Sequence, residues 1–161
     1  AKEKGHEVIL HLPMEAYTRP DLLGPGALFS DMDRETFIKL VNKNIASIPH
    51  VVGVNNHMGS KLTEDKEKME WLMEELATHS LYFLDSKTSE SSIAKSIAAA
   101  NNIPTISRDI FLDHSVNLND MMIQLKHLKF IAKRNGQAVL ICHPYGESLQ
   151  FLKKNINIII N

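Results

Sequence analysis

Short apolar segments alternate with longer amphipathic ones along almost the whole chain, and this alternation limits the fold more than any other feature. The apolar segments are rich in Val, Ile and Leu, as buried parallel strands are. Strands are expected at residues 7–12, 51–54, 81–84, 104–107, 137–142 and 156–160. Helices are expected at 33–47, at 64–79, from Ser89 through Ala98, from Asn117 to just before Gly136, and at 147–154. The alternation predicts right-handed crossovers and a parallel sheet, either open or curled into a barrel.

Charge and composition exclude several classes of protein. The 161 residues include 18 Lys+Arg and 19 Asp+Glu, so no charge excess favours nucleic acid or an acidic membrane surface. No apolar run approaches the roughly 20 residues of a membrane span, which predicts a soluble protein. The single cysteine, Cys142, excludes an internal disulfide and a cysteine-based zinc cluster. Length and composition therefore predict one domain over residues 1–161.

The first residues give a further expectation about that domain. The segment from Ala1 to His6 has the pattern of the last turn of a helix, with Gly5 as its C-terminal cap, and it has no signal-peptide pattern. The chain is therefore expected to begin partway through its fold, as an N-terminally incomplete domain. The long segment 13–32 contains Pro and Gly and is expected to be an irregular loop, either the cover or wall of a functional site or a disordered segment.

Polar side chains stand at the ends of the expected strands. The strand at 51–54 runs directly into a cluster of two amides and a histidine, and four other strand ends carry a His, Asp or Arg. These residues are His11, Asn55, Asn56, His57, Asp85, Arg108, Asp109 and His143. Because ligands bind at the carboxyl ends of strands in parallel α/β proteins, a functional site is predicted there.

Familiar nucleotide and hydrolase motifs are absent from the sequence. Gly24-Pro25-Gly26 is not a dinucleotide loop, no Gly-Lys-Ser/Thr run occurs, and no serine lies in a nucleophile elbow. NAD, ATP and a serine triad are therefore disfavoured. Imidazoles and carboxylates at strand ends are the groups that bind a divalent metal and move protons near neutral pH, so they favour metal-assisted hydrolysis.

Five motifs in a fixed order carry a resemblance to a known family. They are His11-Leu12-Pro13-Met14-Glu15, Gly53-Val54-Asn55-Asn56-His57-Met58-Gly59-Ser60, Phe83-Leu84-Asp85-Ser86-Lys87-Thr88, Ser107-Arg108-Asp109-Ile110-Phe111-Leu112-Asp113 and His143-Pro144. Over nearly the whole chain, this order resembles the divergent polysaccharide deacetylases, which belong with the NodB-type carbohydrate esterases. The resemblance implies a distorted parallel β/α barrel of about seven strands, of which this chain lacks the N-terminal one. It also implies a divalent metal, zinc by expectation, and removal of acetyl groups from amino sugars of envelope or extracellular polysaccharide.

The resemblance also implies roles for the metal-binding residues. In NodB-type enzymes a first strand ends in an Asp-Asp pair and a later one in a His-x-x-x-His pair; the metal ligands come from both. His57 matches the first histidine of the second motif, whereas Lys61 stands where the second would be. His11, or a carboxylate such as Asp85 or Asp113, is expected to replace it. The Asp-Asp strand is expected upstream of Ala1.

The remaining candidates concern catalysis and substrate. His143 resembles the late-strand histidine that acts as general acid on the leaving amine, and Asp109 is expected to orient it or, with Arg108, to bind substrate. The expected substrate-binding residues are Glu15, Asn55, Asn56, Asp85, Arg108 and Tyr145. Several of the candidate site residues have a plainer explanation. His11 could be satisfied by backbone carbonyls, Asp85 could cap a turn, and Arg108 and Asp109 could pair with each other.

Two other functional classes stay open at this point. A barrel that binds glycan or a cell-envelope partner without catalysis is favoured by the missing second histidine. A phosphoesterase on a similar barrel would release phosphate instead of acetate. By resemblance to the family, the complete protein is expected in the periplasm or outside the cell, with a carbohydrate partner and no nucleic acid.

Overall fold

A computed structural model describes residues 1–160 of the chain, with side chains through residue 157. Contacts group the chain into two compact units, Ala1–Ser107 (unit 1) and Arg108–Asn161 (unit 2). Each unit has a hydrophobic core of its own. They are therefore described one after the other.

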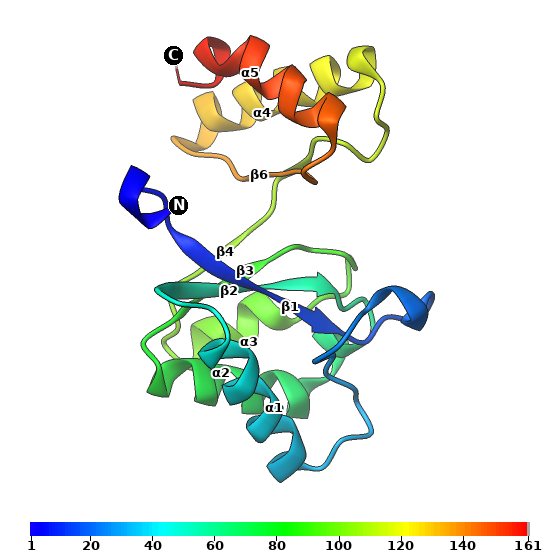
Figure 1. Cartoon of the computed structure of the whole chain (residues 1–161), viewed down its shortest axis with the longest axis vertical. Coiled ribbons are helices and arrows are strands. Elements are labelled where there is room, and N and C mark those ends of the chain that lie inside the picture. Colours follow the sequence, from blue (N-terminus) through cyan, green and yellow to red (C-terminus); the bar gives the residue numbers. More distant parts are fainter. Residues whose placement is uncertain (161) are drawn as a thin grey trace. The chain divides into compact units, whose positions relative to one another are not determined.

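Unit 1 is built on a four-stranded sheet in which every neighbouring pair of strands is parallel (Figure 1). The strand order follows the sequence: β1 (Val8–Met14), β2 (Val51–Met58), β3 (Tyr82–Asp85) and β4 (Thr105–Ser107). The predicted α/β class with a parallel sheet is thus confirmed.

Three helices of unit 1 lie on the same face of this sheet (Figure 1). They are α1 (Arg34–Ala46), α2 (Lys66–Thr78) and α3 (Ala94–Ala100). Unit 1 also contains three short 3-10 helices: η1 (Lys2–Lys4), η2 (Pro20–Leu22) and η3 (Leu62–Glu64). The predicted cap of the first helix is confirmed, because the carboxylate of Asp33 accepts a hydrogen bond from the backbone N–H of Thr36. Gly5 also ends η1 in the left-handed conformation, with φ 77°.

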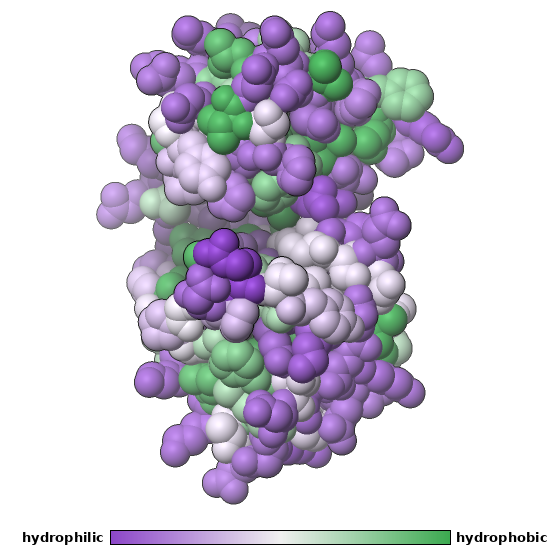
Figure 2. Space-filling view, turned by 90° about the vertical axis from the view of Figure 1, so that its right-hand side faces the viewer, coloured by the Kyte–Doolittle hydropathy of each residue, from purple (hydrophilic) through white to green (hydrophobic). Residues whose placement is uncertain are grey.

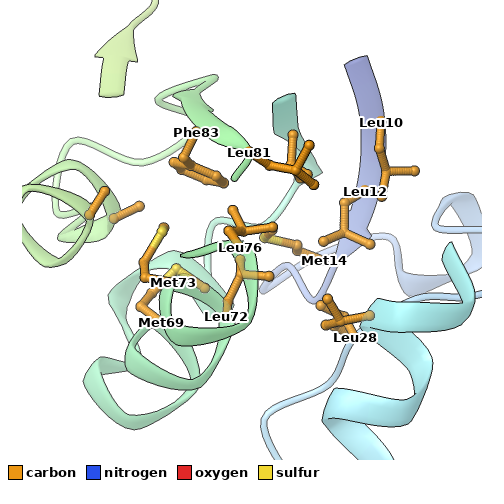
Figure 3. Packing of buried hydrophobic residues seen from close by; sticks show 14 of the residues in the cluster. Leu10, Leu12, Met14, Leu28, Met69, Leu72, Met73, Leu76, Leu81 and Phe83 are labelled. Carbon is orange, nitrogen blue, oxygen red and sulfur yellow. The ribbon is translucent and has the colours of Figure 1, made fainter. Parts of the chain in front are cut away.

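The core of unit 1 lies between the sheet and its helices. Figure 3 shows Leu10 and Leu12 of β1 beside a cluster that includes Leu72 and Leu76 of α2. Side chains along a strand alternate between the two faces of the sheet, so the residue between Leu10 and Leu12 points away from the helices. That residue is His11, which is exposed. The face without helices is therefore the one that carries the imidazole.

Unit 2 is an α/β unit with a two-stranded parallel sheet. Its elements are β5 (Ile110–Phe111), α4 (Leu118–Asn135), β6 (Leu140–Ile141) and α5 (Gly146–Ile160). Met121 and Leu125 of α4 pack with Phe151 of α5 in its core. The predicted ends of α4 are confirmed: the side chain of Asn117 caps the first turn, and Gly136 follows the last with φ 79°.

The predicted final strand at 156–160 is wrong, because these residues continue helix α5. A short run of Ile cannot be distinguished from a buried helical segment by its hydrophobicity alone. The deciding signal lies upstream, where buried Ser148 and Phe151 and the partly buried Leu152 recur with helical spacing. The strand expected at 137–142 is shorter than predicted, and β5 was not predicted.

The surface is mixed in character. Figure 2 shows hydrophobic side chains in small groups that hydrophilic ones separate. Among the helices of residues 1–160, none combines the length and the apolar composition that a membrane span requires.

Candidate functional site

Two histidines of unit 1 face each other at the carboxyl ends of neighbouring strands. Nδ1 of His57 lies 3.1 Å from Nε2 of His11, and the ring centroids are 4.8 Å apart. The parallel register explains the approach: His11 pairs with Asn55, which places His57 two residues further along the adjacent strand on the same face. The structure thus brings together the two histidines that the sequence nominated as metal ligands.

The outer nitrogen of each ring has a hydrogen-bond partner of its own. Nδ1 of His11 lies 3.0 Å from Oδ1 of Asn55, and Nε2 of His57 lies 3.3 Å from the carbonyl oxygen of Leu22. Both partners are acceptors, so each outer nitrogen carries the hydrogen of a neutral ring. The two facing nitrogens then both present lone pairs, 3.1 Å apart. Lone pairs repel each other at this distance, so a hydrogen or a cation shared by the two nitrogens would stabilise the pair.

Asn55 and Asn56 have different positions although they are adjacent. Asn55 lies on the same face as the histidines, and its Nδ2 donates to Oγ of Ser86. Asn56 is fully buried; it accepts from the backbone N–H of Ser86 and donates to the carbonyl oxygen of Met58, each at 2.7 Å. Asn55 therefore supports the histidine pair, whereas Asn56 joins β2 to the loop after β3.

Asp85 and Glu15 are both held by hydrogen bonds within unit 1. Asp85 is buried and accepts from the backbone N–H of Lys87 and the hydroxyl of Ser92, which is the turn-capping arrangement. Glu15 accepts from Ser30 and from Nζ of Lys61, the latter at 2.8 Å. Their contact with substrate stays a prediction, and the bonds observed give both a structural role.

Lys61, which stands where the family motif has its second histidine, forms an ion pair with Glu15. Burial raises the pKa of the Glu15 carboxyl, but hydrogen bonds from Lys61 and Ser30 outweigh burial and bring the pKa below its ordinary value. The same bond raises the pKa of the Lys61 ammonium group. A charged lysine engaged in this way is not available as a metal ligand.

Unit 2 holds a second constellation around His143. The buried carboxylate of Asp113 accepts from the backbone N–H of His143 and from the hydroxyl of Ser148, each at 2.7 Å. Its other oxygen lies 3.2 Å from Nδ1 of the same histidine ring. The carboxylate thereby fixes Nδ1 as the hydrogen-bearing nitrogen, and Nε2 is the ring atom left for a proton transfer.

Aromatic rings border His143 on two sides. Phe111 approaches it edge-on with centroids 5.2 Å apart, and Tyr145 is tilted against it at 4.9 Å. The guanidinium of Arg108 lies over the Phe111 ring at 5.4 Å. Arg108 and Tyr145, both predicted to bind substrate, therefore belong to the surroundings of His143.

Asp109 and Asp113 differ from their predicted roles in the contacts they make. Asp109 is exposed and accepts from the backbone N–H of Val139, so it holds β6 beside β5. Asp113, nominated as a metal ligand, lies against His143 instead. Within residues 1–160, no three His, Cys, Asp or Glu residues are grouped so that they could hold one metal ion. The observed contacts favour Asp113 over Asp109 as the residue that orients His143.

Two contributors to these constellations were not predicted. Ser148 is fully buried and donates to Asp113, but a serine in the first turn of a helix has no distinguishing pattern in one sequence. Leu22 takes part through its carbonyl oxygen, which no side-chain pattern can reveal. The expectation that the long loop 13–32 borders the site was the nearest available signal.

The model of the family described as divergent polysaccharide deacetylase matches residues 1–160, and the chain belongs to this family. The resemblance read from the sequence motifs is confirmed.

The chain is also similar to individual proteins from other organisms. The chain is 33% identical over 156 residues to the uncharacterized protein YibQ of Escherichia coli K12, covering 97% of the chain and 49% of that protein. It is 32% identical to an uncharacterized protein of Haemophilus influenzae, covering 97% and 55%. The crystal structure of the uncharacterized protein ATU2773 from Agrobacterium tumefaciens C58 matches 98% of the chain and 65% of its own chain, with 28% identity and a TM-score of 0.92. The chain thus spans about half the length of the curated relatives it matches.

Proposed function

We propose that this chain is the catalytic part of a metal-dependent hydrolase that removes acetyl groups from amino sugars of a cell-envelope glycan. Zinc is the metal we expect, and the complete protein is expected in the periplasm or outside the cell. We also propose that the parallel sheet of unit 1 is a section of a distorted β/α barrel. Membership of the divergent polysaccharide deacetylase family supports each of these proposals.

The observation that carries the proposal is the pair of facing imidazole nitrogens. Zinc–nitrogen bonds are about 2.0–2.1 Å long, so two nitrogen ligands of a tetrahedral zinc ion lie about 3.3 Å apart. The separation of 3.1 Å between His57 and His11 is close to that spacing. Asn55 and the Leu22 carbonyl orient the two rings as outer partners orient metal-bound histidines. His11 and His57 therefore fit as two ligands of a divalent cation.

We assign proton transfer and sugar contact to residues of unit 2. A bound divalent cation supplies Lewis-acid activation of the amide carbonyl and of water. Within unit 2, Nε2 of His143 is the ring atom that would donate a proton, and Asp113 would stabilise the charged ring through Nδ1. Tyr145 and Arg108, which border this histidine, would contact the sugar. Ser148 would act as a positioning residue, because it holds the carboxylate of Asp113 rather than the substrate.

Zinc binding tests the first half of the proposal. In the full chain, His57→Ala and His11→Ala should each weaken zinc binding at least about tenfold in calorimetric titrations. His127→Ala is the control, because it removes an exposed histidine of α4, an element of unit 2, whereas the pair belongs to the strands of unit 1. Equal zinc affinity in wild type and both pair variants would overturn the metal assignment.

Acetate release tests the second half. The zinc-loaded complete protein should release acetate from N-acetylglucosamine oligomers or peptidoglycan fragments, and His143→Gln should lower kcat by roughly 10² to 10⁴. Phosphate release from a phosphoester, without acetate release, would indicate the phosphoesterase class. Zinc binding without either reaction would reject the hydrolase.

The Lys61–Glu15 ion pair favours a second candidate function. It occupies the position of a metal-binding histidine in the family motif. The alternative is a barrel that binds glycan or an envelope partner without catalysis. Binding of glycan fragments by a chain that neither binds zinc nor releases acetate would establish it.

A further inference from the structure

An exposed aromatic ring stands in the loop that follows β1. Tyr17 is 65% exposed, although its hydroxyl and its backbone are both anchored. The hydroxyl donates to Oε2 of Glu64 at 2.8 Å, and the backbone N–H donates to Oγ of Ser60 at 3.2 Å. Ser60 is only three residues after His57 in the sequence. The ring is therefore fixed close to the carboxyl ends of the strands that carry the histidine pair.

The anchor of this ring joins three loops. Glu64 lies after β2 and also accepts a hydrogen bond from the hydroxyl of Ser89, which lies after β3. Tyr17 lies after β1, so the three loops at the carboxyl edge of the sheet share one carboxylate. Because the hydroxyl is already bonded at the edge of the ring, the flat faces of the ring are its free recognition surface. A held ring also loses little conformational freedom when it binds a ligand.

The same loop contacts the histidine pair directly. Leu22 is 53% exposed, and its carbonyl oxygen accepts from Nε2 of His57. The segment from Tyr17 to Leu22 thus presents apolar side chains to solvent while its backbone orients a proposed metal ligand.

We propose that Tyr17 is a stacking platform for one pyranose ring of the glycan, next to the histidine pair. This inference rests on the proposed function, since that function makes the ligand a sugar. A neutral pyranose has a flat C–H face and a rim of hydroxyls. The exposed ring of Tyr17 can stack on the C–H face of the sugar. The oxygen atoms of Glu64, Ser60 and Ser89 beside the ring can form hydrogen bonds with the sugar hydroxyls. One fixed ring among polar groups fits a sugar better than a protein partner, which needs a broad apolar patch.

The test compares two substitutions at the same position. An N-acetylglucosamine tetramer is titrated into the full chain, and proton NMR follows the sugar C–H signals. In wild type, the ring current of Tyr17 should shift the stacked C–H signals upfield. Tyr17→Ala should remove the shift and weaken binding about fivefold or more, whereas Tyr17→Phe, which keeps the ring but loses its bond to Glu64, should keep the shift and bind more tightly than Tyr17→Ala.

Controls separate stacking from folding and from catalysis. Phe130→Ala removes a ring of similar exposure, 67%, from α4 of unit 2 and should leave tetramer binding unchanged. Thermal unfolding shows whether each variant is folded. Folded Tyr17→Ala that binds the tetramer as wild type does would overturn the platform, as would a wild type that shows no shift. Stacking in a chain that releases no acetate would reject the hydrolase and leave the platform standing.

Discussion

Replacement of Asp113 by Asn tests whether unit 2 holds His143 as a directed proton donor. One carboxylate oxygen accepts from the backbone N–H of His143 and from the Ser148 hydroxyl, and the other faces the ring Nδ1 at 3.2 Å. An asparagine can serve the first two donors only with its carbonyl oxygen, so its NH₂ group would face Nδ1. The ring should then present a lone pair at Nδ1 and carry its hydrogen on Nε2.

The size of the effect follows from burial. The side chain of Asp113 has no exposed area, so solvent cannot replace the lost charge-assisted bond. Such a bond contributes about 1.5–3 kcal/mol, and we expect the free energy of unfolding to fall by about that amount. If His143 is the general acid, kcat for acetate release should fall by roughly 10² to 10⁴.

Two measurements examine this prediction without relying on activity. Nitrogen-15 NMR of the imidazoles identifies the tautomer of His143, and urea unfolding gives the free energy. Asp109→Asn is the matched control, because it makes the same charge change at an exposed aspartate that accepts from the backbone of Val139. The reasoning is refuted if Asp113→Asn keeps the wild-type tautomer, or if Asp109→Asn changes it.

Three further substitutions test the surroundings of the histidine pair. Gly53→Ala would place a Cβ 2.6 Å from the Tyr82 ring and should destabilise the chain by about 1–3 kcal/mol in thermal unfolding; an unchanged midpoint would contradict the packing. Asn56→Ala leaves a buried backbone N–H without its acceptor and should cost about 1–3 kcal/mol in urea unfolding. The lowered pKa of Glu15 means that its stabilisation is complete above its ordinary value of 4.5 and is lost as pH falls through the lowered value. Glu15→Gln should therefore destabilise the chain at neutral pH and differ progressively less from wild type in acid, and a constant difference across that range would be evidence against the Lys61 ion pair.

The sequence predicted the parts of unit 1 that depend on repeating hydrophobic patterns. The start of α1 in unit 1 follows from Asp33, and both ends of α4 in unit 2 follow from Asn117 and Gly136, because this capping chemistry is local. The end of β2 did not follow. It was expected at residue 54 but lies at Met58, because pairing with β1 keeps three polar residues in the sheet. Strand formation there depends on a neighbouring strand, which local propensity cannot report.

The sequence predicted which residues belong to the candidate site better than it predicted which of them contact one another. His11 and His57 were nominated because both follow apolar runs, and parallel pairing brings them together. Asp109 was expected to orient His143 and Asp113 to bind a metal, because the sequence does not show which of the two carboxylates flanking residues 110–112 is buried against His143. The role of Ser148 was not predicted, because it depends on the position of this residue in the first turn of α5, a helix whose C-terminal end was predicted to be a strand.

The position of the histidine pair is a consequence of how the core of unit 1 is buried. Leu10 and Leu12 are buried against the helices, so alternation turns His11 to the opposite face. The register of β1 with β2 then sets Asn55 beside it. A slip of β1 by one residue would expose the two leucines and bury the imidazole among α1 and α2. The hydrophobic cost of that slip, about 1.5–3 kcal/mol for each exposed leucine, maintains the geometry of the pair whether or not a cation is bound.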